Sequence, residues 1–453
     1  MKSELIEMLK NQTWNFSSSR IVLTQKTPLP GKSCITILGQ GLVCRQNDQK
    51  ISLTMNIDNP RASNHAILEL WSTSSQGDIL GDQFLFNAKI YDEKHDIEWL
   101  ANDVCIDSLP MTGQISLSIY SLAGSSDTDI NVNTVEARVC SYFEIPCNEY
   151  STISDPTSGL PSRISLDKCQ FNLVDGTELV IFKGDTYIEI KITRCHGNQV
   201  SLLKRALEAI SLLNGKFLEP SLIIEVFANK HKVRIKTCDT VPYGMCIPPP
   251  IKITHPSHFE SFKNFMINYL STFLEEWSLF FNFWHMVYIG YRADTTKCSS
   301  LVLSTTVEGL IQGYFKAYEI STEVTETDIT GAQDYMKAMP SSLLKEKIMT
   351  CIGRGGENPP RKQLEKILTD FGLSKKKAKG MVDKWSKLRN DCTHANDIPL
   401  ANHDDIKEHL ILQRNALCIF YFLLFKHIGY QGFFIDYTAR GHPSKDLSSY
   451  KSS

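Results

Sequence analysis

Several common signatures are absent from this chain, and each absence excludes a class of protein. The 13 cysteines form no C-x-x-C pair and no close cluster. An odd number of scattered cysteines argues against a disulfide framework and predicts a reducing, cytoplasmic compartment. The most apolar run, Trp277 to Tyr291, has 15 residues, whereas a membrane-spanning helix needs roughly 20. The chain also begins without the uninterrupted apolar core of a signal peptide, so we expect no membrane partner.

A strong net charge is also absent. The formal charge is −2, so no global basic field marks the chain as a nucleic-acid coat. The average conceals one basic segment. Between Pro340 and Asn390 there are 13 Lys and Arg against 5 Asp and Glu, a local charge of +8 that leaves −10 elsewhere. Such a segment indicates either one site for an anionic ligand or a solvated helix face.

Familiar catalytic and cofactor motifs are incomplete. Pro30-Gly31-Lys32-Ser33 resembles the end of a phosphate-binding loop, but Lys26 stands where that loop needs its first glycine. No Gly-x-Ser-x-Gly elbow occurs. His255 and His258 have a metal-ligand spacing, yet no nearby cysteine or carboxylate completes a tetrahedral set. We therefore expect neither a cofactor nor a metal.

Hydrophobic periodicity predicts an α+β multidomain protein. Residues 1–250 show strict apolar–polar alternation, as in Ile51-x-Leu53-x-Met55, which is typical of antiparallel sheets. A polar segment near 155–162 suggests a subdivision of this β-rich region. After a proline cluster the pattern becomes helical. We predict a long connecting helix within 251–294, a helical domain over 295–437 whose last helix spans about 403–427, and a flexible tail over 438–453.

The sharpest chemical feature is Arg389-Asn390-Asp391-Cys392-Thr393-His394 in the helical region. An arginine and a histidine five positions apart can hold and cleave an RNA phosphodiester without a metal. The spacing alone carries no weight, because 14 arginines and 12 histidines in 453 residues produce it by chance about 0.4 times.

The context of this motif is more informative than its spacing. Asn390 supplies a second hydrogen-bonding group beside Arg389, and the basic segment leads directly into it. Glu308 lies within the apolar stripe of an earlier helix, where an unpaired carboxylate is costly. Arg389 is a natural partner for Glu308. The alternative is a glutamate at the edge of the stripe that reaches water.

These residues, in this order, resemble the HEPN superfamily of helical ribonucleases, whose mark is R-x4-6-H with a polar residue after the arginine. The resemblance covers roughly residues 295–435. A β-rich region followed by Ser300-Leu-Val-Leu-Ser-Thr-Thr-Val-Glu308 and Arg389-Asn390 looks most like the ApeA group of antiphage defence proteins. Asp391-Cys392-Thr393 departs from the family, which favours an aromatic or aliphatic residue there.

The resemblance implies a metal-independent endoribonuclease. His394 would act as general base or acid, Arg389 would stabilise the phosphate, and Asn390, Asp391 and Glu308 would support them. The preceding lysines Lys379, Lys384 and Lys387 are candidates for binding RNA. The products would carry 2′,3′-cyclic phosphate ends. The implied partners are host RNA, tRNA among the candidates, and a phage-derived trigger acting on the N-terminal region.

Helix geometry bears on the same site. Five positions along an ideal helix rotate by about 500°, which separates Arg389 and His394 by about 140°. Either the helix breaks near Asp391, or two protomers each contribute residues. The resemblance implies the second arrangement, in a homodimer or higher even oligomer.

Two other functions stay open at this stage. The helical domain could bind a nucleotide or RNA without cleaving it. Alternatively, the chain is an interaction scaffold in which the Arg389 and His394 pair is coincidental.

Overall fold

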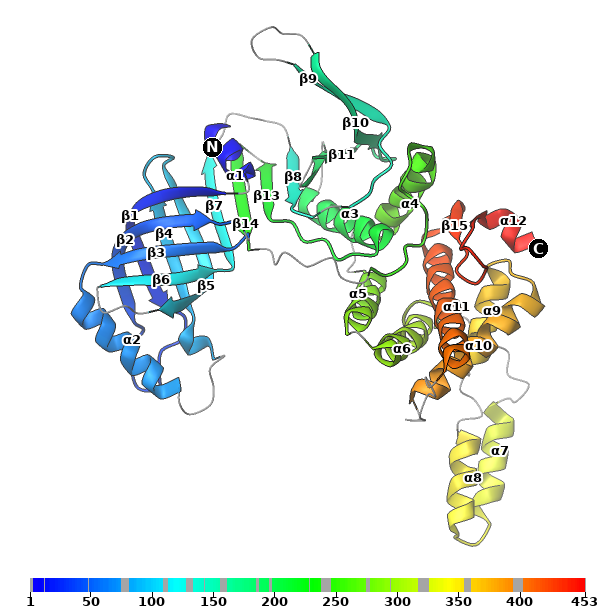
Figure 1. The fold of residues 1–453 in the computed structure, drawn as a ribbon. Coiled ribbons are helices and arrows are strands. Elements are labelled where there is room, and N and C mark those ends of the chain that lie inside the picture. The colour runs from blue at the N-terminus through cyan, green and yellow to red at the C-terminus, as the bar shows by residue number, and fades with distance from the viewer. Residues whose placement is uncertain are drawn as a thin grey trace. The chain divides into compact units, whose positions relative to one another are not determined.

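The structure is a computed structural model of the chain, divided into two compact units. It describes residues 3–11, 13–47, 49–74, 81–108, 113–127, 133–141, 143–154, 161–184, 187–194, 198–227, 229–237, 246–273, 278–293, 295–316, 326–353, 360–393 and 402–452. The first unit comprises Met1–Leu207, Leu218–Gly244 and Thr254–Phe259. The second comprises Glu208–Phe217, Met245–Ile253 and Glu260–Ser453. A β-rich region followed by a helical region confirms the predicted α+β class (Figure 1).

The described strands of the first unit form one antiparallel sheet. They are β1 (Trp14–Gln25), β2 (Thr36–Arg45), β3 (Ile51–Ile57), β4 (Phe86–Asp92), β5 (Ile97–Ser108), β6 (Gln114–Ile119), β7 (Ser121–Asp127), β8 (Thr134–Val139), β9 (Glu149–Ser154), β10 (Pro161–Asn172), β11 (Glu178–Lys183), β12 (Ile188–Thr193), β13 (Leu222–Phe227) and β14 (Lys230–Lys236). Their order is β4-β1-β2-β3-β6-β5-β7-β14-β13-β8-β12-β11-β10-β9, and β4 also pairs with β5. This last pairing closes the first six strands into a ring.

The ring encloses the main core of the first unit. Side chains alternate along each strand, as in β4, where Phe86, Ala88 and Ile90 are buried and their neighbours are exposed. Trp99 of β5 is fully buried. Gly124 of β7 lies against it, at a position where a Cβ would meet the indole ring at 2.6 Å. The strict alternation in the sequence is therefore a direct consequence of this closed sheet.

Helices cover parts of the same sheet. Helices α1 (Ser3–Lys10) and α2 (Pro60–Ser74) place their apolar residues in the core of the ring, and η1 (Asp82–Phe84) is a short 3₁₀ turn. Helix α3 (Gln199–Asn214) begins in the first unit and ends in the second.

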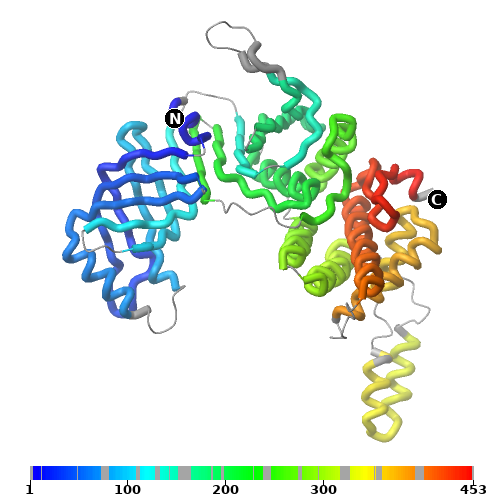
Figure 2. Tube along the Cα trace, viewed as in Figure 1, coloured from blue at the N-terminus to red at the C-terminus, as the bar shows by residue number. Residues whose placement is uncertain are grey.

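The second unit is helical. Its elements are α4 (Phe259–Thr272), α5 (Leu279–Arg292), α6 (Thr296–Tyr314), α7 (Glu326–Lys337), α8 (Leu343–Gly353), α9 (Pro360–Asp370), α10 (Lys375–Thr393), α11 (His403–Ile428), the hairpin β15 (Phe433–Ile435) and β16 (Ser444–Asp446), and α12 (Leu447–Ser452); the turn η2 (Pro256–His258) precedes α4 in the first unit. Figure 2 follows the chain from α9 through α10 and α11. Every residue from Ala416 to Phe425 in α11 is buried, which confirms the predicted central helix.

The predicted connecting helix over 251–294 is wrong. The structure has two helices there, α4 and α5, and α5 begins with its own N-cap. The Ser278 hydroxyl accepts a hydrogen bond from the backbone N–H of Phe281 at 3.1 Å. Both helices are rich in aromatic residues, so the apolar pattern continues across the segment and conceals the start of the second helix.

The predicted flexible tail over 438–453 is also wrong. Tyr450 is buried, and its ring packs against Phe422 and Phe434 at centroid distances of 5.7 and 4.8 Å. The ammonium of Lys377 lies 3.2 Å from the centre of the same ring, a cation–π contact. Strand β16 and helix α12 therefore belong to the helical unit. Through Tyr450, α12 packs against Lys377 near the start of α10.

The predicted subdivision near 155–162 does not separate two sheets. Strands β9 and β10 on either side pair with each other, with Ser154 opposite Pro161, so the segment connects a hairpin; residues 155–160 themselves lie outside the described residues. Polar segments with proline and glycine mark turns as well as linkers.

The predicted boundary at residue 250 also moves, because residues 246–253 belong to the helical unit. The Tyr421 hydroxyl donates to the carbonyl of Pro248, the Tyr437 hydroxyl donates to that of Pro249 at 2.7 Å, and the Ile435 N–H donates to that of Pro250 at 3.0 Å. We name residues 248–250 the proline strap.

The proline strap yields a stability prediction. Tyr421→Phe removes the hydroxyl of a buried tyrosine that donates to the carbonyl of the half-buried Pro248. We expect the free energy of unfolding to fall by about 0.5–1.5 kcal/mol, because this hydrogen bond is lost. Chemical denaturation of the full chain measures this. Tyr150→Phe, at an exposed tyrosine, is the control and should change the free energy by less than about 0.5 kcal/mol. Equal effects of the two substitutions would contradict the role of the strap.

Candidate functional site

Helices α6 and α10 provide the frame of the candidate site. Helix α6 is capped by Thr295, whose hydroxyl accepts from the N–H of Cys298 at 3.2 Å. The buried Trp385 of α10 donates its indole N–H to the carbonyl of Ser304 on α6 at 3.1 Å. This contact fixes one helix against the other one turn before Glu308 and Arg389.

Glu308 and Arg389 form a bidentate ion pair. The Nε of Arg389 donates to Oε2 of Glu308 at 2.7 Å, and Nη2 donates to Oε1 at 3.0 Å. The side chains are 20% and 38% exposed, respectively, so the pair is at the surface and still accessible to a ligand. Two parallel N–H···O bonds fix the plane of the guanidinium. The partnership predicted from the apolar stripe is confirmed.

Helix α10 continues through Asp391 to Thr393, so it does not break near Asp391. His394 follows directly but lies outside the described residues. Its predicted role stays a prediction.

Asn390 and Asp391 lie on other faces of α10. Asn390 is exposed, about 100° around the helix from Arg389. Asp391 is partly exposed, and its charge contributes less to the raised pKa of Lys387 than the hydrogen bond with Glu408 does. Burial and the Asp391 carboxylate raise the pKa of the Cys392 thiol.

The three candidate RNA-binding lysines are exposed on α10. Lys387 and Lys384 lie about 160° and 140° around the helix from Arg389, and Lys379 lies about 80° around and about 15 Å along the axis. The ammonium of Lys387 pairs with Glu408 of α11, and this hydrogen bond is the main cause of its raised pKa. Within one copy of the chain, these lysines do not converge on the Glu308–Arg389 pair.

A buried polar network beside the site was missed by sequence reasoning. The Ser300 hydroxyl is 2.8 Å from Nε2 of His409, and the Gln413 amide donates to the Ser299 hydroxyl at 2.8 Å. All four residues are buried, and burial lowers the pKa of His409. The sequence feature that could have indicated this network is the polar residues at positions of α6 and α11 that face the core. The network fixes α11 against α6.

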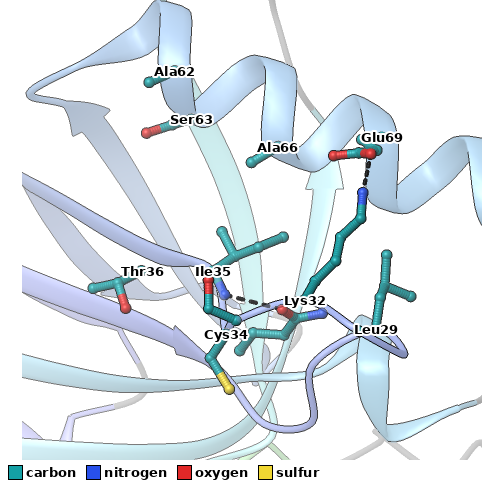
Figure 3. A pocket seen from close by; sticks show the side chains of 12 residues that line it. Leu29, Lys32, Cys34, Ile35, Thr36, Ala62, Ser63, Ala66 and Glu69 are labelled. Atoms are coloured by element: carbon teal, nitrogen blue, oxygen red, sulfur yellow. Dashed lines mark hydrogen bonds and ion pairs between the residues drawn. The ribbon is translucent and has the colours of Figure 1, made fainter.

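A cleft lies elsewhere, in the first unit between α2 and the β1–β2 connection. It has a volume of about 550 Å³ and is lined by Lys32, Ser33, Ala62, Ala66 and Glu69 among others (Figure 3). Lys32 pairs with Glu69 across it. Strand β2, not a helix, follows Pro30-Gly31-Lys32-Ser33, which agrees with the rejection of a phosphate-binding loop.

No family model, curated protein or solved structure matches this chain. None of the described helices has the length and apolar content needed to cross a membrane. Within the same described residues, no group of three or more His, Cys, Asp or Glu is arranged to hold a metal ion. The geometry of α6 and α10, with the Glu308–Arg389 pair between them, is therefore the basis for the function proposed below.

Proposed function

We propose that the chain is a metal-independent endoribonuclease of the HEPN type, most like the ApeA group, that acts in antiphage defence. The observation that carries the proposal is the bidentate Glu308–Arg389 pair. A carboxylate on one helix orients an accessible guanidinium on another, five positions before His394 in the sequence. That is the arrangement the resemblance implies for an arginine that binds a phosphate.

The reaction follows from the chemistry of these side chains. His394, as general base, takes the proton from a ribose 2′-hydroxyl, and the 2′-oxygen attacks the adjacent phosphorus. The bond from phosphorus to the 5′-oxygen breaks, and the leaving oxygen takes up a proton from a histidine or from water. The Arg389 guanidinium stabilises the charge that develops on the non-bridging oxygens. The products carry a 2′,3′-cyclic phosphate and a 5′-hydroxyl.

We infer that the site is composite. Because α10 is helical through Thr393, a continuous helix would direct Arg389 and His394 about 140° apart. Two copies related by a two-fold axis bring Arg389 of one chain toward His394 of the other. Exposed lysines on the far side of α10 could then bind RNA that extends across both copies. Host RNA in the cytoplasm, with tRNA as one candidate, is the proposed substrate.

We further propose that the first unit restrains the nuclease until a phage component binds, since an unrestrained ribonuclease is toxic. The proline strap determines which fragment tests this. A fragment that starts at residue 256 lacks the strap, and one that starts at residue 246 lacks Glu208–Phe217 of the same unit, whereas residues 199–453 retain both. We expect the 199–453 fragment to be more toxic than the full chain when both are produced at equal levels in uninfected cells. A soluble fragment no more toxic than the full chain would contradict restraint.

The proposed activity has a direct test. Purified full-length protein is incubated with total RNA and, separately, with DNA of matched length, in excess EDTA. We expect RNA to be cleaved and DNA to remain intact, because the nucleophile is the 2′-hydroxyl. Cleavage of DNA, or complete loss of RNA cleavage on chelation, would refute the proposal.

A further inference from the structure

Helices α7 and α8 form a hairpin with a well-defined tip, shown in yellow in Figure 1. The Ser342 hydroxyl caps α8 by accepting from the N–H of Lys345 at 3.1 Å. The Lys345 ammonium donates to the carbonyls of Lys337 and Met339 at 3.0 and 2.6 Å. A cation on the last carbonyls of α7 stabilises its C-terminus. Backbone groups on both sides of the turn therefore have hydrogen-bond partners within the hairpin.

The hairpin exposes apolar side chains. Tyr335, Leu343 and Leu344 are 71%, 80% and 67% exposed, and Met339 and Ile348 are also exposed. These five are a quarter of the 20 exposed large apolar residues found in the described chain, within 14 consecutive positions. We name them the hairpin patch. A cluster of exposed apolar side chains of this kind is typical of an interaction site.

The hairpin lacks a core of its own. Among the described side chains of residues 327–350, only Met336 is buried. Helices in proteins are stabilised mainly by packing of an apolar face, and two short helices with one buried side chain gain little from it. No described segment of this chain covers the hairpin patch. Packing against a further surface would supply the contacts that these two helices lack.

The charge distribution favours a second copy of the chain as the occupant. Residues 327–350 contain three acidic and three basic side chains, so two hairpins do not repel each other. One acidic and one basic side chain already form an ion pair within the hairpin, since the Lys337 Nζ lies 2.9 Å from the Asp334 Oδ1. A neutral, apolar surface offers little to RNA, which is bound through its phosphates.

The available area also suits self-association. The hairpin patch exposes on the order of 600 Å² in each copy, so two copies would bury roughly 1,200 Å², the lower limit of a specific interface. Two helical hairpins packed through their apolar faces make a four-helix bundle, which gives both copies the core that each lacks.

We propose that the hairpin patch binds the same patch of a second chain and forms a four-helix bundle. This interface is separate from the composite site around Arg389 and does not depend on the proposed nuclease activity. If both interfaces form and the assembly closes, it is a tetramer; if only the hairpin associates, it is a dimer.

The test is the mass of the full chain in solution, measured by light scattering over a wide range of concentration. The variant carries Leu343→Glu and Leu344→Glu, which place like charges in the bundle. We expect the assembly mass to fall by half. The control carries Leu68→Glu and Val174→Glu, at residues of comparable exposure in the first unit, and we expect it to keep the wild-type mass.

A second variant, Tyr335→Asp, changes the other helix of the hairpin, α7. Circular dichroism of both variants measures whether their helices still form. Tyr335→Asp should also halve the mass. A wild-type chain that is monomeric at every concentration would overturn the proposal, as would variants that keep the wild-type mass. A hairpin variant of half mass that still cleaves RNA separates this interface from the composite site. A fall from dimer to monomer with no RNA cleavage by either protein would support the hairpin and count against the proposed nuclease.

Discussion

Replacing His394 by alanine should slow RNA cleavage by about 10²–10⁴-fold, the usual contribution of a general acid or base. The substitution removes the group that takes the 2′-hydroxyl proton and leaves Arg389 and Glu308 in place. RNA binding should change little, because the imidazole acts on the proton and the lysines supply the charge. The measurement is the single-turnover cleavage rate of a defined RNA with full-length protein in excess EDTA.

His403→Ala is the matched control. His403 is the first residue of α11, exposed and close in sequence to His394, and it has no role in the proposed reaction. Its rate should stay within about threefold of wild type. If His394→Ala cleaves as fast as His403→Ala, the nuclease assignment of the motif fails, and binding of RNA without cleavage becomes the better account.

Replacing Glu308 by alanine should lower the cleavage rate by about 10²-fold without comparable loss of stability. Glu308 fixes the plane of the Arg389 guanidinium through two N–H···O bonds, and a small displacement of a positioning group can cost that much in rate. Arg389 is 38% exposed, so water screens the pair and its removal should change the free energy of unfolding by less than about 1 kcal/mol. The rate and the denaturation curve measure the two effects separately.

Glu308→Gln and Asp383→Ala complete this test. A glutamine keeps one acceptor oxygen, so the rate should lie between those of wild type and Glu308→Ala. Asp383 of α10 is another carboxylate that pairs with an arginine, in this case Arg361 of α9. Replacing Asp383 by alanine should leave the cleavage rate unchanged. Equal losses from Glu308→Ala and Asp383→Ala would show that any disturbance of α10 matters, and the positioning role of Glu308 would be refuted.

The central pairing of the site could be predicted from the sequence because it obeys a local rule. A carboxylate within an apolar stripe needs a cationic partner, and Arg389 was available in a second helix. The alternation of strands such as β3 and β4, and the central position of α11, were predictable for the same reason, since one face or all faces of each element are apolar.

Other features depend on contacts between distant segments. The proline strap is bound by Tyr421 and Tyr437, which no periodicity connects to residues 248–250. Tyr450 is the only large aromatic residue of a polar tail, yet a pocket formed by Phe422, Phe434 and Lys377 buries it. Polar network residues such as His409 resemble surface residues in the sequence and are buried only because Ser300 satisfies them. Composition cannot reveal such pairings.

The most direct test of the proposed reaction is the chemistry of the cleaved ends. A short RNA with one mapped cleavage site is incubated with the full-length protein in EDTA, beside the same RNA carrying a 2′-deoxyribose at the nucleotide whose hydroxyl attacks. We predict 2′,3′-cyclic phosphate and 5′-hydroxyl ends on the first substrate and no cleavage at that position of the second. Continued cleavage of the deoxy substrate, or products with 3′-hydroxyl and 5′-phosphate ends, would contradict attack by the 2′-hydroxyl and with it the proposed function.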